Sequence, residues 1–207
     1  MRRNESVADR ESLATIEAVT DQINKQVVDI ISWVKTSKGI DFLKFEKQLL
    51  DKVYDLGRLF ISLFLCMRQA HLELTHSEKN FDGKRQGAKG RLIGTVFGKV
   101  RYFRTYIYRG KIEGGYYPLD LELGLPWDGF SMLVRSYAVR LATKLSYAQC
   151  VAVLSMCFQW SPSQKSIEEI EFSTRVADAR EQPPALVAEG HGDYASEVDA
   201  EAYLKIL

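Results

Sequence analysis

The stretch GTVFGKVRYFRTYIY, from Gly94 to Tyr108, decides how the middle of this chain folds. Apolar and polar residues alternate on both sides of Phe97-Gly98-Lys99, and β-branched and aromatic residues dominate. Period-two alternation with this composition is typical of half-buried strands. The stretch therefore predicts a β-hairpin with strands over 93–97 and 100–108 that turns at Phe97-Gly98-Lys99.

Two long helical patterns precede the hairpin and meet near Gly39. Their apolar residues recur three or four positions apart, which predicts an α-helical hairpin within residues 1–78. Gly57 inside the second helix costs about 1 kcal/mol relative to alanine, and we expect it to serve close packing. The apolar positions are Ile16, Val19, Ile23, Val27, Ile30 and Val34 in the first helix and Phe42, Phe45, Leu49, Val53, Leu56, Phe60, Leu63 and Met67 in the second.

A basic segment separates the helices from the rest of the chain. The sequence HSEKNFDGKRQGAKGR, from His76 to Arg91, contains three glycines and no apolar periodicity, so it predicts a linker. Positions 79–111 hold ten Lys or Arg residues and one Asp, although the whole chain has a net charge of only +1. The charge is therefore polarised, and residues 79–116 form a unit of basic linker and β-hairpin.

Residues 117–180 predict a helical domain that begins with an irregular connector from Tyr117 to Pro126. Asp128 or Ser131 is the expected N-cap of the first helix, and Ser146 begins the second. The sequence predicts a third helix after Trp160, and the last two helices fit a helix-turn-helix, whose second helix enters a major groove. The overall expectation is a mainly α fold with a small β-hairpin.

The third helix of this domain carries its own start signal. Ser161 is the expected N-cap, Pro162 occupies the first helical position, and Gln164 follows the cap by three residues, as in a capping box. Glu168, Glu169 and further acids follow, and they disfavour phosphate contact unless they face away from it. An ordinary α-hairpin is the alternative interpretation of the same pattern.

The basic hairpin is the strongest electrostatic signal. Each cation that docks on a phosphate releases counterions, which gives a salt-sensitive affinity that does not depend on sequence. The interleaved aromatics Tyr102, Phe103, Tyr106 and Tyr108 are candidates for stacking on bases; the alternative is that half of them cover the core and the cations are solvated. The candidate DNA contacts are Lys99, Arg101, Arg104 and Arg109 in the hairpin and Gln164, Lys165 and Ser166 in the third helix.

Enzyme and metal chemistry find no support in the sequence. It contains neither a P-loop nor a dinucleotide fingerprint in a strand–helix context. Cys66, Cys150 and Cys157 lack zinc-ligand spacing and are expected to be reduced thiols of a cytoplasmic protein. The polar start is not a secretory signal, and no apolar run reaches the roughly 20 residues needed to span a bilayer.

The order of these elements resembles the N-terminal half of a bacterial insertion-sequence transposase of the ISKra-type and ISLre-like group. Three motifs within residues 91–172 carry the resemblance. They are T-V-F-G-K-V-x-x-x-R-T-Y from Thr95 to Tyr106, YPLD…LGLP in the connector, and S-Y…A-x-x-L…S in the helix-turn-helix from Ser146 to Ser166. The helices before residue 78 are compatible with this family without carrying its motifs.

The resemblance implies that this region binds double-stranded DNA at the ends of the element, in the bacterial cytoplasm and associated with the nucleoid. In the family it precedes an RNase-H-like domain whose carboxylates hold two divalent metal ions for strand transfer. Residues 181–207 are expected to be a linker or tail leading to that domain, with AYLKIL as its first strand, so no cofactor is expected in this chain and no activity from it alone. We also expect homo-oligomers through the N-terminal helices. The alternatives are a free-standing DNA-binding regulator and a helical interaction or dimerisation module.

Overall fold

The computed structural model describes residues 7–76, 83–112 and 114–181. Six helices and a three-stranded antiparallel sheet make up this part of the chain, which confirms the expected mainly α fold with a small β-hairpin. The expected linker and tail at 181–207 lies outside the described residues, apart from Glu181. The expected strand AYLKIL therefore has no structural description.

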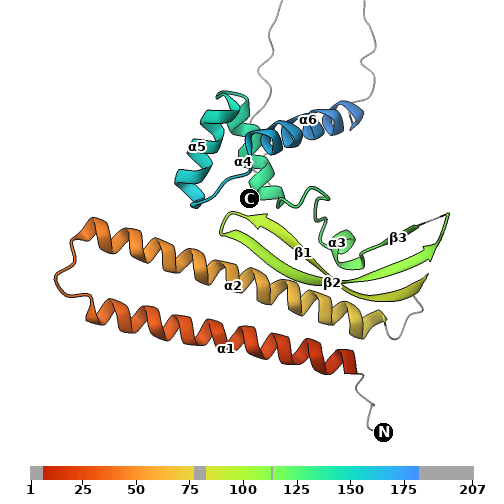
Figure 1. The fold of residues 1–207 in the computed structure, drawn as a ribbon, viewed down its shortest axis with the longest axis horizontal. Helices are drawn as coiled ribbons and strands as arrows, with labels where there is room; N and C mark the ends of the chain where they lie inside the picture. Colours follow the sequence, from red (N-terminus) through yellow and green to blue (C-terminus); the bar gives the residue numbers. More distant parts are fainter. Residues whose placement is uncertain (1–6, 77–82, 113, 182–207) are drawn as a thin grey trace, which may run out of the picture.

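Helices α1 (Val7–Thr36) and α2 (Phe42–His76) form the expected α-hairpin, and α2 lies between α1 and the sheet (Figure 1). Their antiparallel contact is fixed near the turn by Trp33 and Phe45, whose rings stack with centroids 4.9 Å apart. The Trp33 ring also lies below the Lys52 ammonium, 5.1 Å from its centroid. Ile23 of α1 is buried against α2, whereas Val27 and Val34 of the expected apolar pattern are exposed.

The sheet has the order β1–β2–β3, formed by Lys84–Thr95, Gly98–Gly110 and Gly114–Tyr116. Thr95 pairs with Gly98, so the hairpin turns at 96–97 and the expected turn at Phe97-Gly98-Lys99 was placed too late. Gly98 begins β2 with a positive φ of 120°, and a Cβ there would lie 3.0 Å from the Arg58 guanidinium. Gly98 is therefore the first residue of β2 and does not lie at the centre of the turn.

Strand β1 begins well before the expected hairpin, because Lys84 already pairs with Tyr108. The prediction of a linker from His76 to Arg91 is therefore wrong for 84–91, and its residues 77–82 lie outside the described part. Backbone hydrogen bonds to the long β2 hold this glycine-rich half of β1. The Phe103 ring lies 3.3 Å from where a Cβ of Gly90 would be, so a cross-strand aromatic covers the missing side chain.

Two elements were not predicted as regular structure. Strand β3 pairs with β2 through Ile107 and Tyr116, beyond the two strands of the predicted hairpin. The short helix α3 (Pro118–Glu122) begins the connector, with proline in its first turn, where its missing N–H costs nothing. Both elements pack on β2, and α3 also brings Leu119 into the core.

The first hydrophobic core joins α2, the hairpin and α3. It crosses the expected unit boundaries at 78/79 and 116/117, so these three segments support one another. Its buried members are Leu65, Leu72, Ile93, Val100, Tyr102 and Leu119.

Helices α4 (Met132–Ala142), α5 (Tyr147–Phe158) and α6 (Gln164–Glu181) form a three-helix unit around a second core, above the turn of the hairpin (Figure 1). Ser131 caps α4, as one of the two expected candidates, by accepting from the Val134 N–H. Ser146 caps α5 in a capping box with Gln149. The buried residues of this core are Ala138, Cys150, Leu154, Ile167 and Ile170.

The start of α6 differs from the prediction. Ser163, not Ser161, caps the helix by accepting from the Ser166 N–H at 3.1 Å, and Ser161 donates to the Pro162 carbonyl instead. The Trp160 side chain is hydrogen-bonded to the hairpin. Residues 159–163 therefore form a non-helical connection, and α6 begins only at Gln164. The predicted cap at Ser161 and proline at the first helical position are therefore wrong by two residues.

Candidate nucleic-acid interface

Lys99, Arg101 and Phe103 lie on β2 at alternate positions and are all exposed. Side chains two residues apart on a strand share one face and lie about 7 Å apart. The residues between them, Val100 and Tyr102, point into the core. We call Lys99, Arg101 and Phe103 the outer face of the hairpin. Within the described part of the chain neither Lys99 nor Arg101 has a carboxylate partner, so both predicted contacts are available to an anion.

Phe103 gives the outer face an apolar end, because this residue is 61% exposed. Leu92, which pairs with Arg101 across the hairpin, is also exposed. The other predicted stacking residues are engaged: Tyr102 is buried and donates to Asp120 Oδ1 at 2.8 Å, and Tyr106 packs on the Tyr117 ring. Tyr108 is half-buried, so Phe103 is the aromatic with the open ring.

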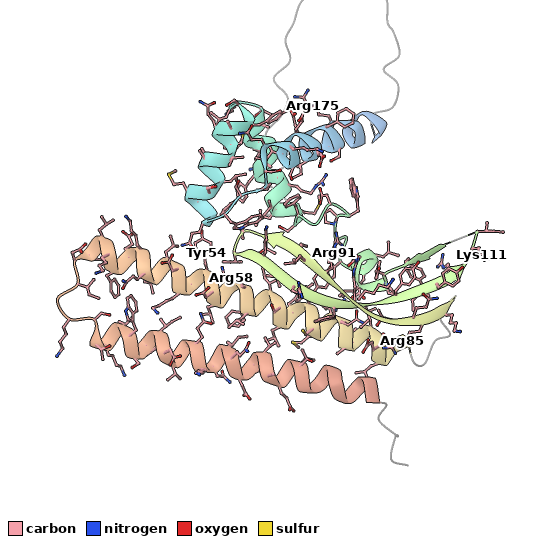
Figure 2. The ribbon with its side chains drawn as sticks, viewed as in Figure 1. Tyr54, Arg58, Arg85, Arg91, Lys111 and Arg175 are labelled. Carbon is pink, nitrogen blue, oxygen red and sulfur yellow. The ribbon has the colours of Figure 1, made fainter. Side chains whose placement is uncertain are left out.

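Arg104 occupies a different environment from Arg101, although both were predicted to contact DNA. Its guanidinium forms an ion pair with Asp120 and lies 3.5 Å from the centroid of the Tyr117 ring. Burial lowers the pKa of Arg104, and the nearby positive charge of Arg91 lowers it further, whereas Tyr102 and Tyr117 partly oppose this shift. Arg91 joins the same carboxylate through a hydrogen bond of 2.9 Å, beside α3 in Figure 2. Arg104 therefore ties β2 to α3, which does not favour phosphate contact by this residue.

A second group of cations lies at the opposite end of the sheet. Arg109 places its guanidinium over the Tyr116 ring, 4.4 Å from the centroid, and Lys111 is exposed. Figure 2 shows Lys111 far from the turn that contacts the C-terminal helices. Lys99 and Arg109 are ten positions apart on one strand, which corresponds to about 34 Å. The predicted hairpin contacts therefore divide between the two ends of β2.

The predicted contacts on α6 are electrostatically weaker. Gln164 and Lys165 are exposed, and Ser166 is half-buried with its hydroxyl 2.9 Å from the Ser163 hydroxyl. Lys165 lies 3.8 Å from the exposed Glu169 carboxylate, and Glu168 is exposed as well. Exposed carboxylates repel phosphates, so this helix offers less attraction for DNA than the outer face does.

Glu171 does face away from the exposed side of α6. It is 8% exposed and accepts a hydrogen bond of 2.7 Å from the Tyr147 hydroxyl on α5. That bond, with Arg175 as a further partner, lowers the pKa of the Glu171 carboxyl. Glu171 therefore holds α5 and α6 together, and Arg175 lies at the outer side of the unit in Figure 2.

The connection between α5 and α6 is fastened to the turn of the hairpin. Trp160 Nε1 donates to the Thr95 carbonyl at 2.9 Å, and the Trp160 ring stacks on Phe130. A Cβ on Gly94 would lie 2.4 Å from the Trp160 ring. Since Gly94 pairs with Lys99, the three-helix unit contacts the hairpin on the side that carries the outer face.

Sequence reasoning missed this junction, although Gly94 carried a signal for it. A glycine inside an otherwise regular strand often marks the close approach of another group. On the other side of the junction, the Tyr54 hydroxyl of α2 donates to the Cys157 carbonyl of α5. Figure 2 shows Tyr54 and Arg58 on α2, facing the three-helix unit.

Other kinds of site are not formed by the described residues. They gather no group of three or more His, Cys, Asp or Glu side chains that could hold a metal ion. None of the described helices is long and apolar enough to cross a membrane. Comparisons of the chain with protein-family models, curated proteins and solved structures give no match.

Proposed function

We propose that this chain binds double-stranded DNA through the outer face of its hairpin, as the DNA-binding portion of an insertion-sequence transposase. The observation that carries the proposal is the exposure of Lys99 and Arg101 on one side of a strand, without carboxylate partners among the described residues. The transposase identity rests on the resemblance of the motifs within residues 91–172. We assign no strand-transfer chemistry to these residues.

A rigid strand is a suitable carrier for phosphate contacts. The spacing of about 7 Å between Lys99 and Arg101 is fixed by the backbone, and α2 and α3 support β2 from behind. The guanidinium of Arg101 suits bidentate contact with a phosphate, whereas Lys99 acts as a point charge. The exposed Phe103 ring provides apolar contact beside them.

The contribution of α6 is secondary in this proposal. Gln164 and Lys165 lie within the first turn of the helix, where backbone N–H groups favour anions. The neighbouring Glu168 and Glu169 oppose this attraction. We therefore expect the hairpin to supply most of the salt-dependent affinity and α6 to add a smaller part.

The test is the salt dependence of binding to a labelled duplex of random sequence, measured by fluorescence anisotropy. Because each phosphate contact contributes about one to the slope of log K against log salt, K99A/R101A should lower that slope by about two. The matched control is K44A/K47A, which removes two exposed cations from α2 and should leave the slope unchanged. K165A should lower it by less than one.

Two results would contradict the proposal. If K99A/R101A left the slope unchanged, the outer face would not contact DNA. If K44A/K47A lowered it equally, the attraction would come from general charge and not from the hairpin. A regulator and a transposase portion are distinguished by the DNA that follows codon 207, where a transposase requires an acidic, RNase-H-like reading frame.

A further inference from the structure

Helix α2 carries an exposed apolar stripe that none of the described elements covers. Its seven apolar residues are 45–59% exposed and all occupy a or d positions of a heptad repeat over 43–74. A strict seven-residue repeat drifts around an α-helix and favours a left-handed supercoil with a partner helix. The stripe consists of Leu43, Leu50, Val53, Phe60, Phe64, Met67 and Leu74.

The stripe is separate from the two faces of α2 that are already packed. Phe45 and Lys52 face α1, while Leu65 and Leu72 face the sheet. Helical periodicity places the stripe between these faces. It also places three exposed residues of α1, Val27, Ile31 and Val34, on the same flank of the α1–α2 pair.

The residues of the stripe are complementary in size to the same stripe running in the opposite direction. With a twofold axis between Arg58 and Leu59, Val53 meets Phe64 and Leu50 meets Met67 of a second copy. Phe60 meets Gly57, where the ring of Phe97 takes the place of the missing side chain. Val53 thus faces the larger Phe64, as interdigitation requires, whereas Leu50 faces Met67 of similar size and Phe60 faces the Phe97 ring beside Gly57.

The repeat has two polar residues, Glu46 and His71, and the antiparallel arrangement sets one against the other. Glu46 and His71 are equally distant from the proposed axis and both are exposed. An antiparallel pair of helices sets the Glu46 carboxylate against the His71 imidazole, whose N–H donates to it. A parallel pair would set Glu46 against Glu46, which is repulsive, so the polar residues favour the antiparallel arrangement.

We propose that a second copy of this chain covers the stripe, in a symmetric dimer whose two α2 helices pack antiparallel. The stripe and its α1 border extend over roughly 46 Å by 20 Å, on the order of 900 Å² per copy, which is the size of a standard interface. The whole-chain net charge of +1 opposes association only weakly. This inference does not depend on DNA binding.

The first test measures the mass of the full chain in solution by light scattering and sedimentation. The wild-type protein should be a dimer, and F64E should raise the dimer dissociation constant at least about 100-fold, because it buries an unpaired carboxylate. V28E is the control, since Val28 is 63% exposed on α1 outside the stripe. It should leave the dimer intact, and circular dichroism should show the same helix content for all three proteins.

The second test checks the antiparallel register by exchanging charges. E46K and H71E should each weaken the dimer, on the order of tenfold for two symmetric pairs, and the double variant should recover the wild-type constant. A monomeric wild-type protein, equal effects of F64E and V28E, or additive losses in the double variant would each overturn the proposal.

Discussion

Gly57 shows how one residue can satisfy packing at the expense of local propensity. It lies in the middle of α2, where glycine is unfavourable, yet a Cβ there would be 2.4 Å from the Phe97 ring. The turn of the hairpin rests on this open position, and the nearby Arg58 Nη1 donates to the Phe97 carbonyl at 2.8 Å. The sequence-based expectation of close packing at Gly57 is confirmed.

Gly57→Ala should therefore destabilise the protein, although alanine is the better helix former. We expect the free energy of unfolding to fall by about 1–2 kcal/mol, because overpacking outweighs the gain in propensity. Urea denaturation measures the change. In a Phe97→Ala background the same substitution should stabilise the protein instead, and a stabilising effect in the wild-type background would contradict the packing argument.

Arg101 and Arg104 show which part of the candidate site the sequence could predict. Both belong to the basic run, but Arg104 shares the even-numbered face of β2 with the buried Val100 and Tyr102. Strand alternation could therefore have separated it from Lys99 and Arg101. Its partner Asp120 could not be predicted, because the contact depends on α3, which was expected to be irregular.

At the level of elements, long periodic patterns were predicted well and backbone-held strands were not. Helices α1 and α2 follow from apolar spacing over 30 and 35 residues. The first half of β1 and all of β3 have few side chains of high strand propensity, and their pairing with β2 holds them in place. Such strands depend on a neighbour, which a single-sequence pattern does not contain.

The start of α6 gives a prediction at this scale. Ser163→Ala should lower the free energy of unfolding by about 1 kcal/mol, because the cap accepts the Ser166 N–H. Ser161→Ala should change it by less than about 0.5 kcal/mol, since that side chain only donates to the next carbonyl. Chemical denaturation of both variants decides between them, and a larger loss at Ser161 would place the cap where the sequence alone suggested it.

For the whole molecule, the decisive feature is the junction between its two cores. Trp160 donates a hydrogen bond to the Thr95 carbonyl of the hairpin, and Tyr54 of α2 donates one to the Cys157 carbonyl of α5. The three-helix unit is therefore held on both sides of the connection between α5 and α6. The described part of the chain is therefore not a row of independent modules. The positions of the outer face and of α6 are fixed relative to each other.

Trp160→Ala should loosen this junction and leave the first core in place. Amide hydrogen exchange in α4–α6 should quicken at least about tenfold, while exchange in the middle of α2 stays unchanged, because removing a packed aromatic costs several kcal/mol locally. Trp127→Ala is the control, since Trp127 is 85% exposed. Equal acceleration in every element would mean that the molecule opens as one unit.

The length of β2 has a consequence for the geometry of a bound duplex. Its basic ends, at Lys99 and Arg109, are ten residues apart, or about 34 Å, close to one turn of B-DNA. Thr105 and Ile107 are buried between these ends, so a duplex that reached both ends would contact the strand at two separate points. The spacing of the two basic ends would then match one helical period of the duplex. In an overwound or underwound site, only one of the two ends would lie against the matching groove.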